Sequence, residues 1–142
     1  MDSRICVDAS LALKLVLPEP DSDHAAVEWQ NWTKSGVEVA APYLFIYETS
    51  SVLRNRVYRK ELTHKEADDA LGILVGLGIT YLHPPGILQS AWEFARRFNR
   101  PTAYNCFYLA LAHQQGCPLW TGDKRLYNAV KDSLGWVHLL GR

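Results

Sequence analysis

The chain has 142 residues, of which 48% are hydrophobic and 21% are charged, a composition that fits one globular domain and excludes a disordered or fibrous protein. Fifteen lysines and arginines balance fifteen aspartates and glutamates, so no overall positive field draws the protein onto nucleic acid or an anionic membrane. The longest apolar stretch, residues 71–82, contains three glycines and is shorter than the roughly 20 residues that span a bilayer. A transmembrane helix is thereby excluded, and any polyanion must be bound by a local group of charges.

The N-terminus and the cysteines indicate the compartment. Met1-Asp2-Ser3-Arg4 is not the basic start of a secretory signal, and Asp8 interrupts the apolar core that such a signal needs. We therefore expect a cytoplasmic protein. Cys6, Cys106 and Cys117 are odd in number and include no C-x-x-C pair, which favours buried, reduced thiols over a disulfide framework or a zinc site.

Apolar patterns of strand and helix alternate along the chain without a repeat or a linker, which predicts a single domain over residues 1–142. Helix starts are marked by Pro42, by a capping box from Thr63 to Glu66 and by Pro84-Pro85, and a stop by Gly116. This order predicts a mostly parallel sheet covered by helices. The expected elements, in chain order, are strand 4–7, helix 11–17, helix 21–34, strand 37–40, helices from 42 and from 63, strand 79–82, a helix after 85, helix 102–115, strand 119–121, a helix after 122 and strand 137–140.

Asp8 directly follows the apolar strand Ile5-Cys6-Val7, where a buried strand would continue with another apolar residue. A carboxylate at such a position must be paired, hydrated or bound to a metal ion. Because the carboxyl ends of parallel strands form the ligand crevice of an α/β sheet, Asp8 is a candidate site residue. An aspartate that only caps the following helix has the same pattern, so both interpretations remain open.

Three further polar residues, Glu48, Asn105 and Asp123, are also candidate site residues. Glu48 lies on the helix from Pro42, on a largely apolar face, and Asp123 follows the strand 119–121. Asn105 lies in the first turn of the helix 102–115, aligned with apolar residues. A polar residue at the start of a helix also forms local hydrogen bonds, which is the alternative for Asn105.

The three carboxylates and the amide come from different elements, and they can converge at the carboxyl edge of one parallel sheet. Oxygen ligands without histidine or cysteine are what a hard cation such as Mg²⁺ or Mn²⁺ requires. Carboxylates crowded in one crevice repel each other unless a cation neutralises them. The residues therefore predict a divalent metal site.

Four stretches of the sequence match one known family in order, spacing and flanking chemistry. The chain resembles a PIN domain and, within that superfamily, the VapC-type toxins of prokaryotic type II toxin–antitoxin pairs. The resemblance covers essentially the whole chain. Its most specific stretches are Ile5-Cys6-Val7-Asp8-Ala9-Ser10, residues 42–52 around Glu48, Ala103-Tyr104-Asn105-Cys106-Phe107-Tyr108-Leu109-Ala110-Leu111-Ala112, and Leu119-Trp120-Thr121-Gly122-Asp123-Lys124-Arg125-Leu126.

The resemblance implies a three-layer α/β/α sandwich around a parallel sheet, with an acidic pocket that binds Mg²⁺ or Mn²⁺ and hydrolyses RNA. It also implies a homodimer and a cognate antitoxin protein as partner. By position, it implies metal ligands at Asp8, Asn105 and Asp123, a water-orienting acid at Glu48, and supporting hydroxyl groups at Ser10 and Thr121. The cation would lower the pKa of a bound water and stabilise charge on the phosphate.

Asn105 departs from the family, which usually has an aspartate at this position. An amide oxygen can bind Mg²⁺, but it brings no negative charge, so we expect weaker metal binding and reduced activity. An engineered substitution, a naturally attenuated enzyme and a pseudo-nuclease kept for binding RNA or protein are the three explanations. Because Asp8, Glu48 and Asp123 remain, we expect an enzyme before a binding module.

Two groups of surface residues are candidates for partner contacts. Basic residues are expected to line the RNA path, although solvated helix faces carry similar residues. Trp29 and Trp32 could serve an antitoxin groove, or they could pack onto the core or a second copy. The basic candidates are Arg54, Arg56, Arg59, Arg96, Arg97, Lys124 and Arg125.

Overall fold

A parallel sheet forms the centre of the computed structural model, which describes residues 3–142. Within those residues, all neighbouring strands are parallel, in the order β3-β2-β1-β4-β5. The register pairs Cys6 of the central strand with Ala40 on one side and Leu119 on the other. The strands are β1 (Arg4–Val7), β2 (Glu38–Pro42), β3 (Thr80–Leu82), β4 (Leu119–Thr121) and β5 (Val137–Leu139).

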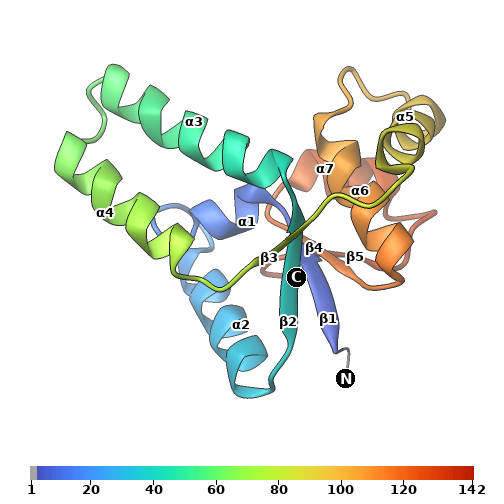
Figure 1. Ribbon diagram of the computed structural model, residues 1–142, viewed down its shortest axis with the longest axis horizontal. Helices are drawn as coiled ribbons and strands as arrows, with labels where there is room; N and C mark the ends of the chain where they lie inside the picture. The colour runs from blue at the N-terminus through green and yellow to red at the C-terminus, as the bar shows by residue number, and fades with distance from the viewer. Residues whose placement is uncertain (1–2) are drawn as a thin grey trace.

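Helices cover both sides of the sheet (Figure 1). One side carries α1 (Ala9–Leu13), α2 (Ser22–Lys34), α3 (Leu44–Tyr58) and α4 (His64–Val75). The other carries α5 (Ile87–Arg97), α6 (Tyr104–Gln115) and α7 (Lys124–Val130). This is the predicted three-layer α/β/α sandwich. Within the described residues, no helix combines the length and the apolar character that a membrane crossing requires.

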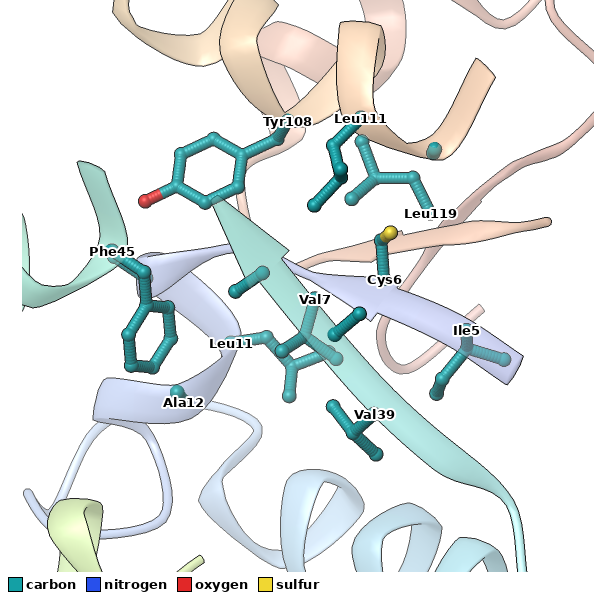
Figure 2. Packing of buried hydrophobic residues seen from close by; sticks show 14 of the residues in the cluster. Ile5, Cys6, Val7, Leu11, Ala12, Val39, Phe45, Tyr108, Leu111 and Leu119 are labelled. Atoms are coloured by element: carbon teal, nitrogen blue, oxygen red, sulfur yellow. The ribbon is translucent and has the colours of Figure 1, made fainter. Parts of the chain in front are cut away.

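The core forms where β1 and β2 pack between the helical layers. Val7, Leu11 and Phe45 meet on one side of the sheet, and Tyr108 and Leu111 approach from α6 on the other (Figure 2). The three cysteines are buried, as predicted, and none forms a disulfide bond. These contacts hold β1 and its carboxyl end in a rigid setting.

The two tryptophans of α2 belong to the interior. Trp32 is 8% exposed, and its ring lies edge to face against Trp29 at 5.7 Å and against Trp120 of β4 at 5.6 Å. Aromatic pairs in this geometry stabilise a core beyond the area that they bury. Trp32 therefore belongs to the core, and the partly buried Trp29 packs against it.

Two predicted helix bounds are wrong. Pro42 is the last residue of β2, not the first turn of a helix, and α3 begins at Leu44. A proline is tolerated there because β2 pairs with β1 only as far as Ala40, so the missing N–H of Pro42 breaks no bond to the central strand. The helix predicted over residues 11–17 starts at Ala9 and ends at Leu13, after which the chain continues in tight turns towards Pro18, a residue that disfavours helix before it.

Candidate active site

The strand order brings the ends of β1 and β4 together at a switch in chain direction. The crossovers from β1 to β2 and β3 run one way across the sheet, whereas β5 follows β4 in the opposite direction. Consecutive helices therefore leave the neighbouring strands β1 and β4 towards opposite faces (Figure 1). Such a switch point opens a crevice at the carboxyl ends of the strands. Asp8 follows β1, and Asp123 follows β4.

Asp8 is buried at this point, with 3% of its surface exposed. Its Oδ1 accepts hydrogen bonds from the Ser10 hydroxyl at 2.7 Å and from the Leu11 N–H at 3.0 Å, and its Oδ2 accepts one from the Thr121 hydroxyl. The bond to Leu11 caps α1, so the capping interpretation is correct. Burial raises the pKa of Asp8, and the charge of Asp123 adds to that rise, whereas the three donors oppose it.

The two hydroxyl groups that donate to Asp8 also tie it to the turn after β4. Ser10 Oγ accepts the Gly122 N–H at 3.0 Å, and Thr121 Oγ1 accepts the Asp123 N–H at 2.9 Å. A Cβ at residue 122 would lie 3.3 Å from both oxygens of Ser10, so glycine allows this close approach. The supporting positions predicted for Ser10 and Thr121 thus lie in direct contact with Asp8.

Asp123 and Asn105 contact each other beside the carboxyl end of β4. Asp123 caps α7 through Oδ1, which accepts the N–H groups of Arg125 at 2.9 Å and Leu126 at 3.2 Å. Its Oδ2 accepts a hydrogen bond from Asn105 Nδ2 at 3.3 Å. The amide therefore stabilises the Asp123 carboxylate in the place where the family aspartate would repel it.

Glu48 reaches the same region from α3, and Tyr108 holds it there. The Tyr108 hydroxyl on α6 donates to Glu48 Oε1 at 2.8 Å. Burial and the nearby charge of Asp8 raise the pKa of Glu48, while this hydrogen bond lowers it. The sequence motifs include Tyr108 but assign it no role. Its position three residues after Asn105, on the same face of one helix, is the signal that could have identified it.

The donor set fits a divalent cation only in part. Within residues 3–142, no group of three or more His, Cys, Asp and Glu side chains is arranged to hold a metal ion. Asp8 and Asp123 supply two carboxylates, and the amide oxygen of Asn105 is a neutral third ligand. Mg²⁺ accepts such a set because it binds through one or two carboxylates and keeps several waters.

The predicted basic residues lie at different distances from the acids. Lys124 and Arg125 are exposed in the first turn of α7, directly after Asp123. Arg54 and Arg56 lie on α3 six and eight residues beyond Glu48, or about 9 and 12 Å along the helix axis. Arg56 also forms ion pairs with Glu19 and Glu61. The crevice thus has Lys124 and Arg125 beside it, whereas Arg54 and Arg56 are farther away.

The remaining basic candidates already have partners. Arg59 pairs with Glu61 at 3.2 Å, and Arg96 pairs with Glu93 at 3.4 Å. The guanidinium of Arg97 lies over the Phe98 ring, 4.9 Å from its centre. In an exposed ion pair of this kind, another anion can readily replace the carboxylate partner, because the pair contributes little free energy.

The chain is similar to known proteins in sequence and in fold. The chain is 34% identical to ribonuclease VapC1 of Mycobacterium tuberculosis over 87 residues, a match that spans 61% of this chain and 63% of that relative. Its fold is similar to PAE2754 from Pyrobaculum aerophilum, with a TM-score of 0.68, 22% identity and coverage of 94% and 91% of the two chains. It is also similar to VapC20 of Mycobacterium tuberculosis, described as a sarcin-ricin loop cleaving toxin, with a TM-score of 0.65, 19% identity and coverage of 89% and 95%.

The family model that matches is the PIN domain, and the match runs over residues 5–132. It therefore includes both aspartates of the crevice, Glu48 and Asn105. The resemblance inferred from the sequence motifs is confirmed, since the curated relatives are named VapC ribonucleases. The chain belongs to the PIN domain family.

Proposed function

We propose that this protein is a metal-dependent endoribonuclease and the toxin component of a toxin–antitoxin pair, acting in the cytoplasm as a single domain over residues 1–142. The observation that carries the proposal is the burial of Asp8 at the switch point, beside Asp123. Among the described residues, no lysine or arginine side chain forms an ion pair with it. A carboxylate buried among hydroxyl groups is costly to ionise without a positive partner, and an added divalent cation would be that partner.

In this proposal, Asp8, Asp123 and the Asn105 oxygen hold Mg²⁺ or Mn²⁺. The cation supplies Lewis acidity, which lowers the pKa of a bound water and stabilises charge on the phosphate. Glu48 orients the attacking water and accepts its proton, a role that suits a carboxylate whose pKa is raised by burial. Lys124 and Arg125 lie where they can contact RNA phosphates; Arg54 and Arg56 would contact a more distant part of the same strand.

A second candidate function, binding without cleavage, is favoured by the hydrogen bond from Asn105 to Asp123. This bond relieves the repulsion in the crevice without any metal ion. A protein of this kind would bind RNA or a protein partner at the same surface. A cognate antitoxin protein is the expected partner in either case.

Cleavage of a mixed, end-labelled RNA panel tests the first function against the second. We expect cuts with Mn²⁺ or Mg²⁺ and none with EDTA, because the aspartates alone cannot activate water. Glu48→Gln serves as the matched control, since it keeps the shape of the side chain and removes its basicity. If neither the protein nor its Asn105→Asp variant cuts any RNA while both are folded, the ribonuclease proposal is wrong.

We also propose that two copies associate through an apolar hollow of about 280 Å³ between α3, α5 and α6. Tyr43, Tyr47 and Tyr104 line it and expose 46%, 63% and 60% of their surfaces, which is typical of an interaction site. Light scattering after gel filtration should give the mass of a dimer, and Tyr43→Arg should give a monomer. Tyr58→Arg, at the far end of α3, should leave the dimer intact; a parent protein that is monomeric would contradict the proposal.

A further inference from the structure

The Glu48 carboxylate depends on one neighbouring side chain for its position. Tyr108 donates to Glu48 Oε1 at 2.8 Å, and within residues 3–142 no ion pair or second side-chain hydrogen bond reaches this carboxylate. A glutamate side chain has several rotatable bonds, so a half-buried glutamate without such a partner would sample several rotamers. The hydrogen bond from Tyr108 selects one of them.

Tyr108 is itself fixed by the core. Its side chain is 1% exposed, and α6, which carries it, packs against β1 and β2. Figure 2 shows the ring extending from α6 beside the carboxyl end of β2, with its oxygen directed towards α3, the helix that carries Phe45 and Glu48. Because Asn105 lies three residues earlier on α6, one rigid helix aligns both the amide and the support of Glu48.

The hydroxyl of Tyr108 is the donor in its hydrogen bond to Glu48. Burial and the charges of Glu48 and Asp8 raise the pKa of Tyr108 above its ordinary value. These surroundings favour the protonated phenol, which is the form that donates to the glutamate. A buried tyrosine that loses its acceptor would leave an unsatisfied hydroxyl in the core.

We infer that Tyr108 is a positioning residue of the active site, which holds Glu48 in the orientation that receives the proton of the attacking water. The inference rests on the proposed ribonuclease function. It assigns to α6 a second role besides carrying Asn105. In this role a buried side chain sets the orientation of the group that receives the proton.

Tyr108→Phe tests this role, because it removes one oxygen and keeps the ring. We expect kcat for RNA cleavage to fall about 10- to 100-fold, as for other residues that orient a catalytic group. KM for RNA and the affinity for Mn²⁺ should stay unchanged, because Tyr108 is 1% exposed and is not one of the proposed metal ligands. Tyr81→Phe, at a partly buried tyrosine of β3, is the matched control and should leave kcat unchanged.

A double-mutant cycle separates positioning from a general loss of structure. In the Glu48→Gln background, the Tyr108→Phe change should cost no further activity, because its effect passes through Glu48. Equal losses of activity in both backgrounds would overturn the inference and leave the ribonuclease function standing. The same holds if the parent cuts RNA and its Tyr108→Phe variant has an unchanged kcat. Absence of cleavage by both the parent and its Asn105→Asp variant would overturn the two together.

Discussion

Replacing Asn105 by aspartate is expected to raise the affinity for Mn²⁺ at least about tenfold, because a third carboxylate joins Asp8 and Asp123 around the cation. In the present protein, the amide NH₂ group faces Asp123 at 3.3 Å, and this group cannot bind a cation. RNA cleavage at limiting Mn²⁺ should rise with the affinity.

The same substitution should make folding depend on the metal. Without a cation, the new carboxylate faces Asp123, and like charges at this distance destabilise the folded state. We expect the Asn105→Asp variant to unfold at a lower temperature than the parent in EDTA and at a higher one in excess Mn²⁺. Calorimetric titration and thermal unfolding measure both effects. Asn31→Asp, an equal charge change on exposed α2, should alter neither. An unchanged Mn²⁺ affinity in Asn105→Asp would show that residue 105 does not face the metal.

Asp8→Asn is expected to abolish RNA cleavage, with a loss of at least about 10³-fold, as for other groups that act directly at a reacting centre. Asp8 is the most deeply buried acid of the crevice, and no other described carboxylate can replace it on β1. Asp68→Asn, at an exposed aspartate of α4, keeps the same chemical change away from the site and should retain activity. Cleavage by the Asp8→Asn variant at the parental rate would remove Asp8 from the mechanism.

Asp8 should also make the unfolding free energy of the metal-free protein depend on pH. Burial raises its pKa above the ordinary value of 3.8, so over an interval above pH 4 the folded state keeps a proton that the unfolded chain has lost. The unfolding free energy therefore falls as the pH rises through that interval. Urea unfolding in EDTA between about pH 4.5 and 7.5 should show this slope, and Asp8→Asn should flatten it. Glu48, whose pKa is also raised, accounts for the slope that remains.

Two carboxylates with lowered pKa values, Glu38 and Glu66, affect the stability of the protein in a different range of pH. The pKa of Glu38 is lowered by Arg4, and that of Glu66 by the backbone N–H of Thr63. Their contributions to stability are lost only as the pH falls below their ordinary value of 4.5. A slope of opposite sign above that value, with stability rising as the pH rises, would contradict the raised pKa of Asp8.

Local sequence signals determined the elements and the residues that they carry. The apolar strand before Asp8, the capping box at Thr63 and the stop at Gly116 each act through neighbouring residues, so their patterns are visible in the sequence. The class of fold followed from the alternation of these elements. The bounds near Pro42 and Leu13 were wrong, because strand register and tight turns depend on neighbours that a local pattern does not contain.

Only the tertiary structure decided which acids meet. Strand order places β4 beside β1, more than a hundred residues away in the chain, and this contact brings Asp123 and Thr121 to Asp8. The bond between Tyr108 and Glu48 likewise joins two helices on opposite sides of the sheet. The sequence by itself predicted the type of chemistry, since carboxylates at strand ends are costly to bury without a partner. Their partners were decided by packing, because side-chain contacts between distant elements form only when the whole core closes.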